Sequence, residues 1–432
     1  MIPDIWIILA VMVIAFILAK IKLSVEISMM AAAIAGLLAG AFFSTPPIDR
    51  MTYHIVNGTL TYLDIILVFI TATFLMEVIS ASGGSNWVVA SIVNRFGRKP
   101  ALTMTLLTLV LLIPGALSGV GTTALVMLGG PVAAVLGTFG LPKRRVAGIL
   151  FIMASLGAVA PPVNLWAMIS CAGASIPYVG FEIPLLVPVL ILSFFTLIVL
   201  GRGAKAPTQE ELKSVTPTVE KGVTWWRVVT PFLVLIVMMV AYRLWPFEFP
   251  VLGMPLQFAI SGAVACLLAK KKVNVIELTK NAIERVLPLI ATTIAVGMLQ
   301  EAMSSTGVRG LLSYGLLSLP MLVLFITLPI TMPVAGGLLA FGVASVFGSP
   351  MLWLFQFQGM NLIIALSGLT LLWALGTAIP PTAVIGRFTV MVTGYKELYL
   401  KFLTGMWLPW LMITAIGTLM VVYSTKLTFL IP

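Results

Sequence analysis

The chain has 432 residues, of which 60% are hydrophobic and only 9% are charged. A mean hydropathy of +1.14 excludes a soluble domain of this size and predicts an all-α polytopic membrane protein set in a lipid bilayer. The formal net charge of +11 is typical of a membrane protein that keeps lysine and arginine in its cytoplasmic loops, so it does not predict a nucleic-acid partner.

Apolar runs at about 5–19, 27–43 and 58–81 predict the first three spans. Asp4 precedes the first run, whereas Lys20 and Lys22 follow it, which is the reverse of the charge order in a signal peptide. We therefore expect the N-terminus outside, in the cytoplasmic (inner) membrane of a bacterium or archaeon. The single histidine, His54, is expected as a solvated residue of an outside loop.

The stretch Ala101–Leu141 has basic residues at both ends, which places both ends in the cytoplasm. One straight helix cannot do this, and "PGALSGVGTT" interrupts the stretch at its middle. A re-entrant helical hairpin satisfies both observations, because irregular backbone at membrane depth is tolerated inside protein or beside a wet cavity. Its tip would carry five small or hydroxyl residues, namely Ser118, Gly119, Gly121, Thr122 and Thr123.

The next span is interrupted by a double proline in "GAVAPPVNLW", and the residues of interest there are Gly157, Pro161, Pro162 and Asn164. Proline removes a backbone donor and clashes with the preceding helical turn, so the helix is expected to break. An apolar run at about 183–201 follows. The polar stretch 202–224 is the expected cytoplasmic linker between two halves of the chain.

The second half repeats the plan of the first. The predicted spans lie at about 228–245, 255–269, 287–303 and 403–424. The stretch "VIELTKNAIERV" predicts an amphipathic helix along the cytoplasmic surface, and Arg309 is expected on the outside.

A second hairpin is expected at about 319–349, with Gly336 and Gly337 at its tip. A second broken helix is expected at about 361–393, where "GTAIPPTAVIG" supplies Gly376, Thr377, Pro380, Pro381 and Thr382. Inverting the topology of the first half leaves the C-terminus outside as well.

Three sequence patterns occur in both halves of the chain. "LGAVAPP" at 156–162 matches "LGTAIPP" at 375–381 with an offset of 219, and Pro114 matches Pro333 with the same offset. "LMEVISASG" matches "LQEAMSSTG" with an offset of 224, which pairs Glu77 with Glu301. We interpret residues 1–201 and 225–432 as inverted repeats, which with interrupted helices are typical of secondary transporters.

These residues resemble the large membrane subunit of the tripartite ATP-independent periplasmic (TRAP) transporters, in the ion transporter superfamily of elevator-type carriers. The resemblance is best over 57–201, where a glycine- and serine-rich hairpin tip precedes a Gly–x–x–x–Pro–Pro break. It implies sodium-driven uptake of an organic acid, a small four-helix membrane partner and a periplasmic binding protein. The second tip, "MPVAGGLLAFG", lacks the hydroxyl groups of the family pattern, so a stand-alone carrier of the same superfamily remains an alternative.

The candidate site consists of the two hairpin tips and the two breaks. Freed carbonyls at the breaks would bind sodium, and the half-helix N-termini would bind an organic anion. The expected sodium ligands are Ser118, Thr122, Gly157 and Gly376. No organic cofactor is expected, and an oligomer remains open.

Several of these residues also have an ordinary structural explanation. The tip hydroxyls could bond to their own helix carbonyls, and Asn164 could cap a helix. Glu77 and Glu301 are interpreted as structural carboxylates, and Arg387 as an interfacial cation. An intramembrane enzyme is disfavoured because no catalytic cluster of side chains is evident, and a channel is the third alternative.

Overall fold

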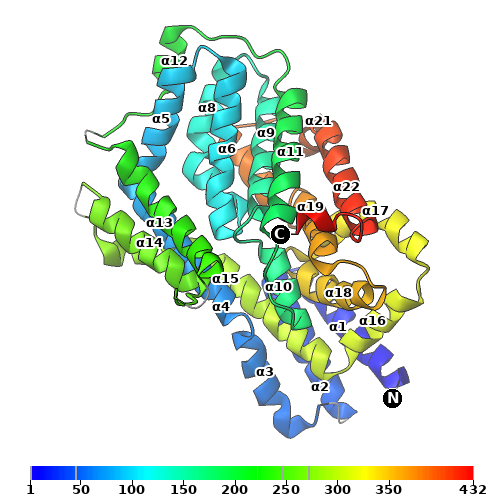
Figure 1. The fold of residues 1–432 in the computed structure, drawn as a ribbon. Helices are drawn as coiled ribbons and strands as arrows, with labels where there is room; N and C mark the ends of the chain where they lie inside the picture. The colour runs from blue at the N-terminus through cyan, green and yellow to red at the C-terminus, as the bar shows by residue number, and fades with distance from the viewer. Residues whose placement is uncertain (1, 44–45, 221, 246–247, 271–272, 432) are drawn as a thin grey trace.

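The computed structural model describes residues 2–43, 46–220, 222–245, 248–270 and 273–431. Within these ranges every regular element is a helix (Figure 1). The first half, up to the linker, contains α1 (Ile2–Lys20), α2 (Val25–Phe42), η1 (Ile48–Arg50), α3 (Met51–Leu60), α4 (Leu63–Ala81), α5 (Gly84–Phe96), α6 (Pro100–Ser118), α7 (Gly121–Ala124), η2 (Leu125–Gly129), α8 (Gly130–Thr138), α9 (Lys143–Val159), α10 (Leu165–Ala174) and α11 (Glu182–Leu200).

The linker contains one short helix, α12 (Gln209–Val215). The second half contains α13 (Trp225–Leu244), α14 (Met254–Leu268), α15 (Val275–Ser305), α16 (Val308–Ser318), α17 (Met321–Leu339), η3 (Ala344–Gly348), α18 (Ser349–Phe357), α19 (Leu362–Gly376), α20 (Val384–Thr393), α21 (Tyr399–Gly405), α22 (Trp407–Val422) and η4 (Thr428–Leu430).

Within the described part of the chain, seven helices are long and apolar enough to cross a membrane, or eight when α21 and α22 count as one bent span. Two expected boundaries are wrong. The amphipathic stretch before 287 is no separate surface helix, because α15 runs without interruption over 31 residues. The final run is two helices that meet at an angle of 61°.

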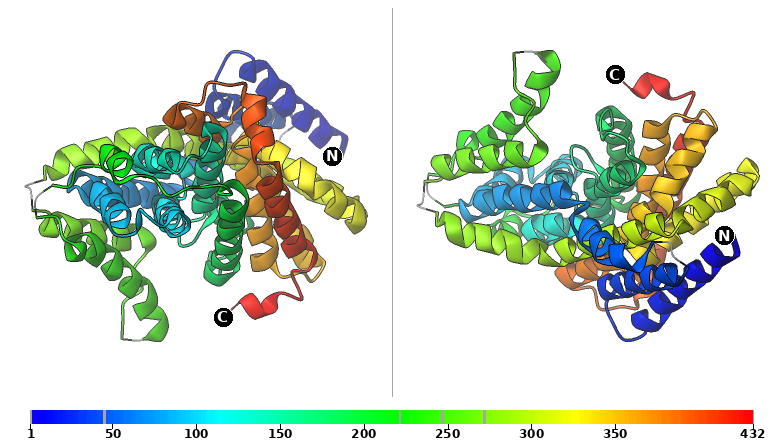
Figure 2. Two further views of the ribbon diagram at one scale, coloured as in Figure 1. Left: turned by 90° about the horizontal axis from the view of Figure 1, so that it is seen from above. Right: turned by 90° about the horizontal axis from the view of Figure 1, so that it is seen from below.

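The two halves contain the same series of elements. Each has a pair of helices, a long helix, a short helix, a hairpin with a π-helix after its tip, and a broken helix. The π-helices η2 and η3 are offset by 219 residues, like the breaks. The pairs are exchanged between the halves, because α2 packs against α15 and α14 packs against α4. The pairs α1–α2 and α13–α14 accordingly lie on far sides of the molecule (Figure 2).

The hairpin turns are not equivalent in length. Six residues separate α6 from η2, whereas four separate α17 from η3. Pro114 therefore lies four residues before the end of α6, and Pro333 lies six residues before the end of α17. The sequence match of these two prolines does not place them at the same point of their helices.

The first hairpin enters and leaves on the side of the linker. Gly97, just before α6, lies against Leu212 of α12, and the Lys205 amide donates to the Phe139 carbonyl at 2.9 Å. The guanidinium of Arg145 also donates to the Arg202 carbonyl at 2.6 Å. Both ends of this segment thus meet the same stretch of chain, as its basic flanks predict.

The helices form two groups (Figure 1). One group contains α2, α3, α4, α14 and α15, with α1 and α13 at its edges. The other contains the hairpins and broken helices, with α6 and α20 packed on α9, and α17 and α22 packed on α19. Helices α9 and α19 pack against each other at the centre of the second group, which positions the two breaks.

Candidate functional site

The two proline breaks approach each other through hydroxyl and amide contacts. Ser155 Oγ on α9 lies 3.3 Å from Thr377 Oγ1, directly after α19. Asn164 Nδ2 donates to Thr370 Oγ1 at 3.0 Å, although these residues are 206 positions apart. The structure therefore brings together the candidate residues that the sequence placed in separate halves.

The first break is closed by its own side chains. Asn164 is fully buried, and its Oδ1 accepts the Ala167 amide at 3.1 Å, which caps α10. Its second Nδ2 bond goes to the Val159 carbonyl at 3.1 Å, at the end of α9. The Val163 amide donates to the Ala116 carbonyl at 3.1 Å and joins the break to the first hairpin. Pro161 and Pro162 are half-buried.

The second break is more open. Ala383 occupies the position equivalent to Asn164, has φ +42°, and offers no polar side chain to cap α20. Pro380 and Pro381 are exposed, and Val384 at the start of α20 is 51% exposed. Thr382 Oγ1 donates to the Gly337 carbonyl at 2.8 Å, which joins this break to α17. Val384 therefore reaches solvent, whereas Ala383 and Ile385 are buried and the Gly386 amide donates to the Thr377 carbonyl at 3.2 Å.

The first hairpin tip is held by its serine. Ser118 Oγ donates to the Pro114 carbonyl at 2.7 Å and accepts the Val120 amide at 3.3 Å, a structural use of this hydroxyl. Gly119 has φ +68°, which favours glycine. A Cβ at Gly121 would collide with the Ala154 carbonyl of α9. Two further tip residues differ in burial: Thr122 is half-buried and Thr123 is buried.

The second tip lies later than the sequence indicates. The turn is at Ala340, whose φ is +51°, so Gly336 and Gly337 lie in the last turn of α17. A Cβ at Gly336 would come within 2.9 Å of the Trp373 carbonyl, and one at Gly337 within 2.7 Å of Ile379. These glycines allow α17 to pack closely on α19 and the second break.

The carbonyls around the breaks accept hydrogen bonds within the protein. The Gly157 carbonyl accepts the Ala160 amide at 3.1 Å, and the Gly376 carbonyl accepts the Ile379 amide at 2.8 Å. The Tyr399 hydroxyl donates to the Ala378 carbonyl at 2.8 Å. A carbonyl oxygen has two lone pairs, so Gly157 and Gly376 each keep capacity for one further partner.

Each broken helix packs its second part on the hairpin of the other half. Helix α20 contacts η2, and α10 contacts η3. The α10 contact is polar: Ser170 Oγ donates to the Ala344 carbonyl at 3.1 Å, and Ser349 Oγ donates to the Ser170 carbonyl at 3.2 Å. The residue equivalent to Ser170 is Thr389, which bonds to its own helix at Ile385.

The polar contact extends to the first group of helices. Ser345 Oγ donates to Gln300 Oε1 of α15 at 3.1 Å, and the Tyr62 hydroxyl also donates to this oxygen. Gln300 is not among the residues predicted for the site, because its neighbour Glu301 carries the charge. A polar residue within an apolar 287–303 run was the available signal.

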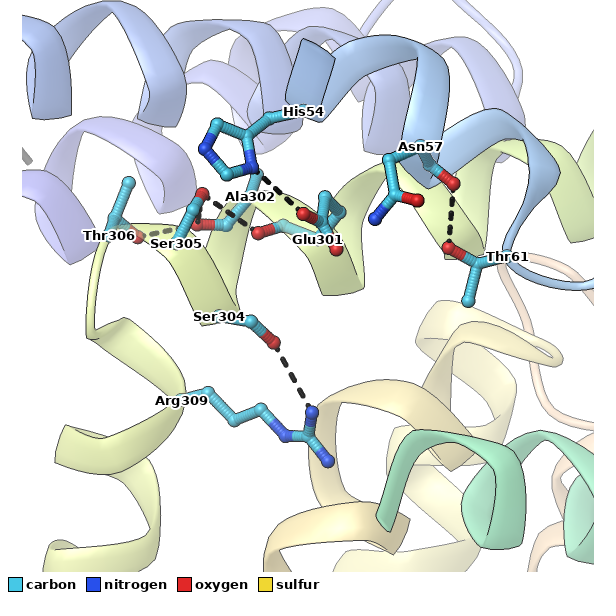
Figure 3. Close-up of polar contacts among 9 residues, drawn as sticks. All are labelled: His54, Asn57, Thr61, Glu301, Ala302, Ser304, Ser305, Thr306 and Arg309. Atoms are coloured by element: carbon cyan, nitrogen blue, oxygen red, sulfur yellow. Dashed lines mark hydrogen bonds and ion pairs between the residues drawn. The ribbon is translucent and has the colours of Figure 1, made fainter. Parts of the chain in front are cut away.

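Charged residues in the helices have specific partners (Figure 3). His54 lies in α3 rather than in a loop, and its Nδ1 is 2.8 Å from Glu301 Oε1. Glu77 pairs with Arg285 at 2.5 Å. These pairs agree with the structural interpretation of both glutamates. Arg387 is exposed on the first turn of α20.

Arg309, which is expected on the outside of the membrane, is buried in the protein. Arg309 lies at the start of α16 and is 8% exposed. Its Nη1 donates to Ser304 Oγ at 3.2 Å (Figure 3). Its Nη2 donates to the Gly173 carbonyl. The guanidinium also lies 4.2 Å from the centre of the Trp353 ring. It therefore places a positive charge at the C-terminal end of α10, where the helix dipole favours one.

Two solved structures share this arrangement. The chain has the fold of a transporter. The Alcanivorax borkumensis YdaH transporter is 15% identical, with a TM-score of 0.61 over 90% of this chain and 91% of that chain. Neisseria gonorrhoeae MtrF, described among antimetabolite efflux pumps, is 13% identical, with a TM-score of 0.61 over 87% of this chain and 84% of that chain. No family model and no curated protein sequence matches the chain.

These similarities show that the chain shares the overall fold of two membrane transporters. They do not single out the TRAP large subunit. At these identities they describe the fold, and the transported substrate has to be argued from the site itself.

Proposed function

We propose that the chain is a stand-alone secondary transporter of the ion transporter superfamily. It carries a small organic anion, such as a carboxylate or sugar acid, together with a cation by alternating access. Both termini are placed outside the cytoplasmic membrane of a bacterium or archaeon, and the linker is placed in the cytoplasm.

The single observation that carries this proposal is the open N-terminus of α20. The first amides of a helix attract anions because they have no partner within the helix and lie at the positive end of its dipole. In α10 the Asn164 side chain accepts the Ala167 amide. In α20 the equivalent Gly386 amide donates to the Thr377 carbonyl at 3.2 Å, so the amides left for an anion are those of Val384 and Ile385. Exposed Arg387 on the same turn adds a full positive charge. A carboxylate fits this combination of amides and guanidinium.

Cation coupling is supported by the backbone around the breaks. Gly157 and Gly376 present carbonyl oxygens with a remaining lone pair, and Thr122 adds a hydroxyl at the first tip. Oxygen ligands of this kind suit sodium as a transported cargo. A proton would instead need a titratable group, and the described glutamates Glu77 and Glu301 are already paired with basic side chains.

Alternating access would move the group of hairpins and broken helices against the group formed by α2, α3, α4, α14 and α15. This elevator-type motion is supported by the separation of the helices into two groups. Helices α5 and α16 each follow a long helix and precede a hairpin, so they would serve as the arms between the groups.

A stand-alone carrier is favoured over a tripartite one. This one chain matches 91% of the YdaH transporter chain and so supplies nearly all of that fold. A four-helix membrane subunit and a periplasmic binding protein are therefore not required by the proposal.

Transport in proteoliposomes tests the proposal. The purified protein is reconstituted without other subunits, and a panel of labelled carboxylates and sugar acids is supplied under a sodium gradient, a proton gradient or neither. We expect movement of at least one anion that depends on the sodium gradient. Flux that needs no gradient and shows no saturation would indicate a channel, and no flux by folded protein would contradict the proposal.

A further inference from the structure

A basic cavity lies where the linker meets the base of the first hairpin. It has a volume of about 300 Å³, and its walls come from 93–99, at the end of α5 and start of α6, and from 209–216, which includes α12. In Figure 1 these elements lie together at the end of the molecule that carries the linker. The cavity is far along the chain from both breaks and takes no part in the site described above.

Four cations line this cavity: Arg95, Arg98, Lys99 and Lys213. No carboxylate is among the lining residues, and across the described ranges none of the four forms an ion pair. The nearby carboxylate of Glu211 is already engaged, because its Oε2 accepts from both the amide and the hydroxyl of Thr208 at 2.8 Å. The cavity therefore has a concentrated positive charge without a protein counter-ion.

The walls of the cavity are held in place by local bonds. A capping box at Thr208 and Glu211 fixes the start of α12. Gln209, Lys213 and Thr216 then lie on one face of the helix, at the spacing of successive turns. Opposite them, the Lys99 amide donates to the Phe96 carbonyl at 2.7 Å, which fixes the α5–α6 turn.

We propose that this cavity binds a phosphate-bearing anion. Arginine and lysine satisfy the oxygens of a phosphate through charge-assisted hydrogen bonds, and the Gln209 amide adds a neutral donor. Basic residues at the cytoplasmic surface of membrane proteins recognise anionic lipid head groups by the same chemistry. The bound anion holds the linker against the base of the first hairpin, because it bridges cations from both.

Two arms of one experiment separate a lipid head group from a free phosphate. The full chain in detergent is titrated with inorganic phosphate at constant ionic strength, and its thermal midpoint is recorded. In the second arm, the protein is placed in nanodiscs of phosphatidylcholine with or without phosphatidylglycerol. Native mass spectrometry then counts the lipid molecules that stay bound when the protein is released from the nanodisc. Stabilisation by phosphate identifies a free anion, and selective retention of phosphatidylglycerol identifies the lipid.

The variant Arg98→Ala/Lys213→Ala should weaken binding of the effective probe about tenfold or more, since it removes one cation from each wall. Lys205→Ala is the matched control, because Lys205 is an exposed linker cation outside the cavity. If the double variant folds poorly, Lys213→Gln alone, on the exposed face of α12, should give a smaller loss. The proposal is overturned if neither probe binds, or if Lys205→Ala weakens binding as much as the cavity variants.

Discussion

The first break has Asn164 at the position where the second break, 219 residues later, has Ala383. Asn164 is fully buried and makes three hydrogen bonds, which cap α10 and join both halves. Ala383 has no polar side chain, so α20 begins beside exposed prolines without a side-chain cap, and only its Gly386 amide is bonded across the break, to the Thr377 carbonyl. The same backbone plan thus gives one break that is capped by a side chain and one, the proposed anion site, that has no such cap.

The hairpin contacts differ in the same sense. Helix α10 is bonded to the second hairpin through Ser170 and Ser349, whereas α20 meets the first hairpin through Ile385 near Gly121 and Val392 near Gly129. Apolar contacts have no directional hydrogen bonds to break. The difference indicates that the two halves share a backbone geometry but differ in the side chains that join each broken helix to the opposite hairpin.

Replacing the prolines tests this division with the largest expected effect. Pro380→Ala restores an amide donor and lets α19 extend across the open break, so transport per folded molecule should fall by at least tenfold with little change in thermal stability. Pro161→Ala should impair transport too, but with a clear loss of stability, because it disturbs the capped break. Equal stability losses in the two variants would contradict the comparison.

Asn164→Ala should be the most destabilising single change at the first break. It removes a helix cap and leaves buried Val159 and Thr370 groups without their amide partner, a cost of about 2–4 kcal/mol. Asn361→Ala is the matched control, because Asn361 caps α19 through one bond to the Ile364 amide and should cost about 1 kcal/mol. Denaturation of both variants measures the loss in free energy of unfolding. A loss in Asn361→Ala as large as that in Asn164→Ala would contradict the prediction.

Ser170→Ala should cost about 1 kcal/mol, since it leaves the buried Ala344 carbonyl without its hydroxyl donor. Thr389→Val at the equivalent position of α20 should cost less, because the Thr389 hydroxyl bonds only within its own helix. Thermal unfolding of the two variants measures the asymmetry between the hairpin contacts. A larger loss of stability in Thr389→Val than in Ser170→Ala would contradict this asymmetry.

Ala383→Gly should give the smallest effect. The backbone at Ala383 has φ +42°, a conformation that glycine adopts without steric cost, so stability should change by less than about 1 kcal/mol and in the favourable direction. Because glycine also lacks a capping group, transport should be kept. Loss of transport in a stable Ala383→Gly protein would contradict this, and would mean that the buried Ala383 methyl group is needed to hold the start of α20.

The backbone plan of this molecule could be predicted from its sequence. Prolines and glycines acted as local signals for both breaks, and the basic flanks of Ala101–Leu141 predicted a hairpin with both ends on one side. The burial of Arg309 and the pairing of His54 with Glu301 could not be predicted, because they depend on contacts between helices distant in sequence. The Ala340 turn was missed because Gly336 and Gly337 gave the stronger local signal, although their real role is close packing on α19.

The central claim, that the open N-terminus of α20 receives the anion, is tested most directly by the charge at position 384. Val384 is exposed at the first position of α20, so Val384→Glu places a carboxylate where the substrate carboxylate would lie, and Val384→Gln is its neutral match. In proteoliposome transport, the account predicts that Val384→Glu raises the substrate KM about tenfold or more relative to Val384→Gln. Equal KM values for the two variants would contradict it.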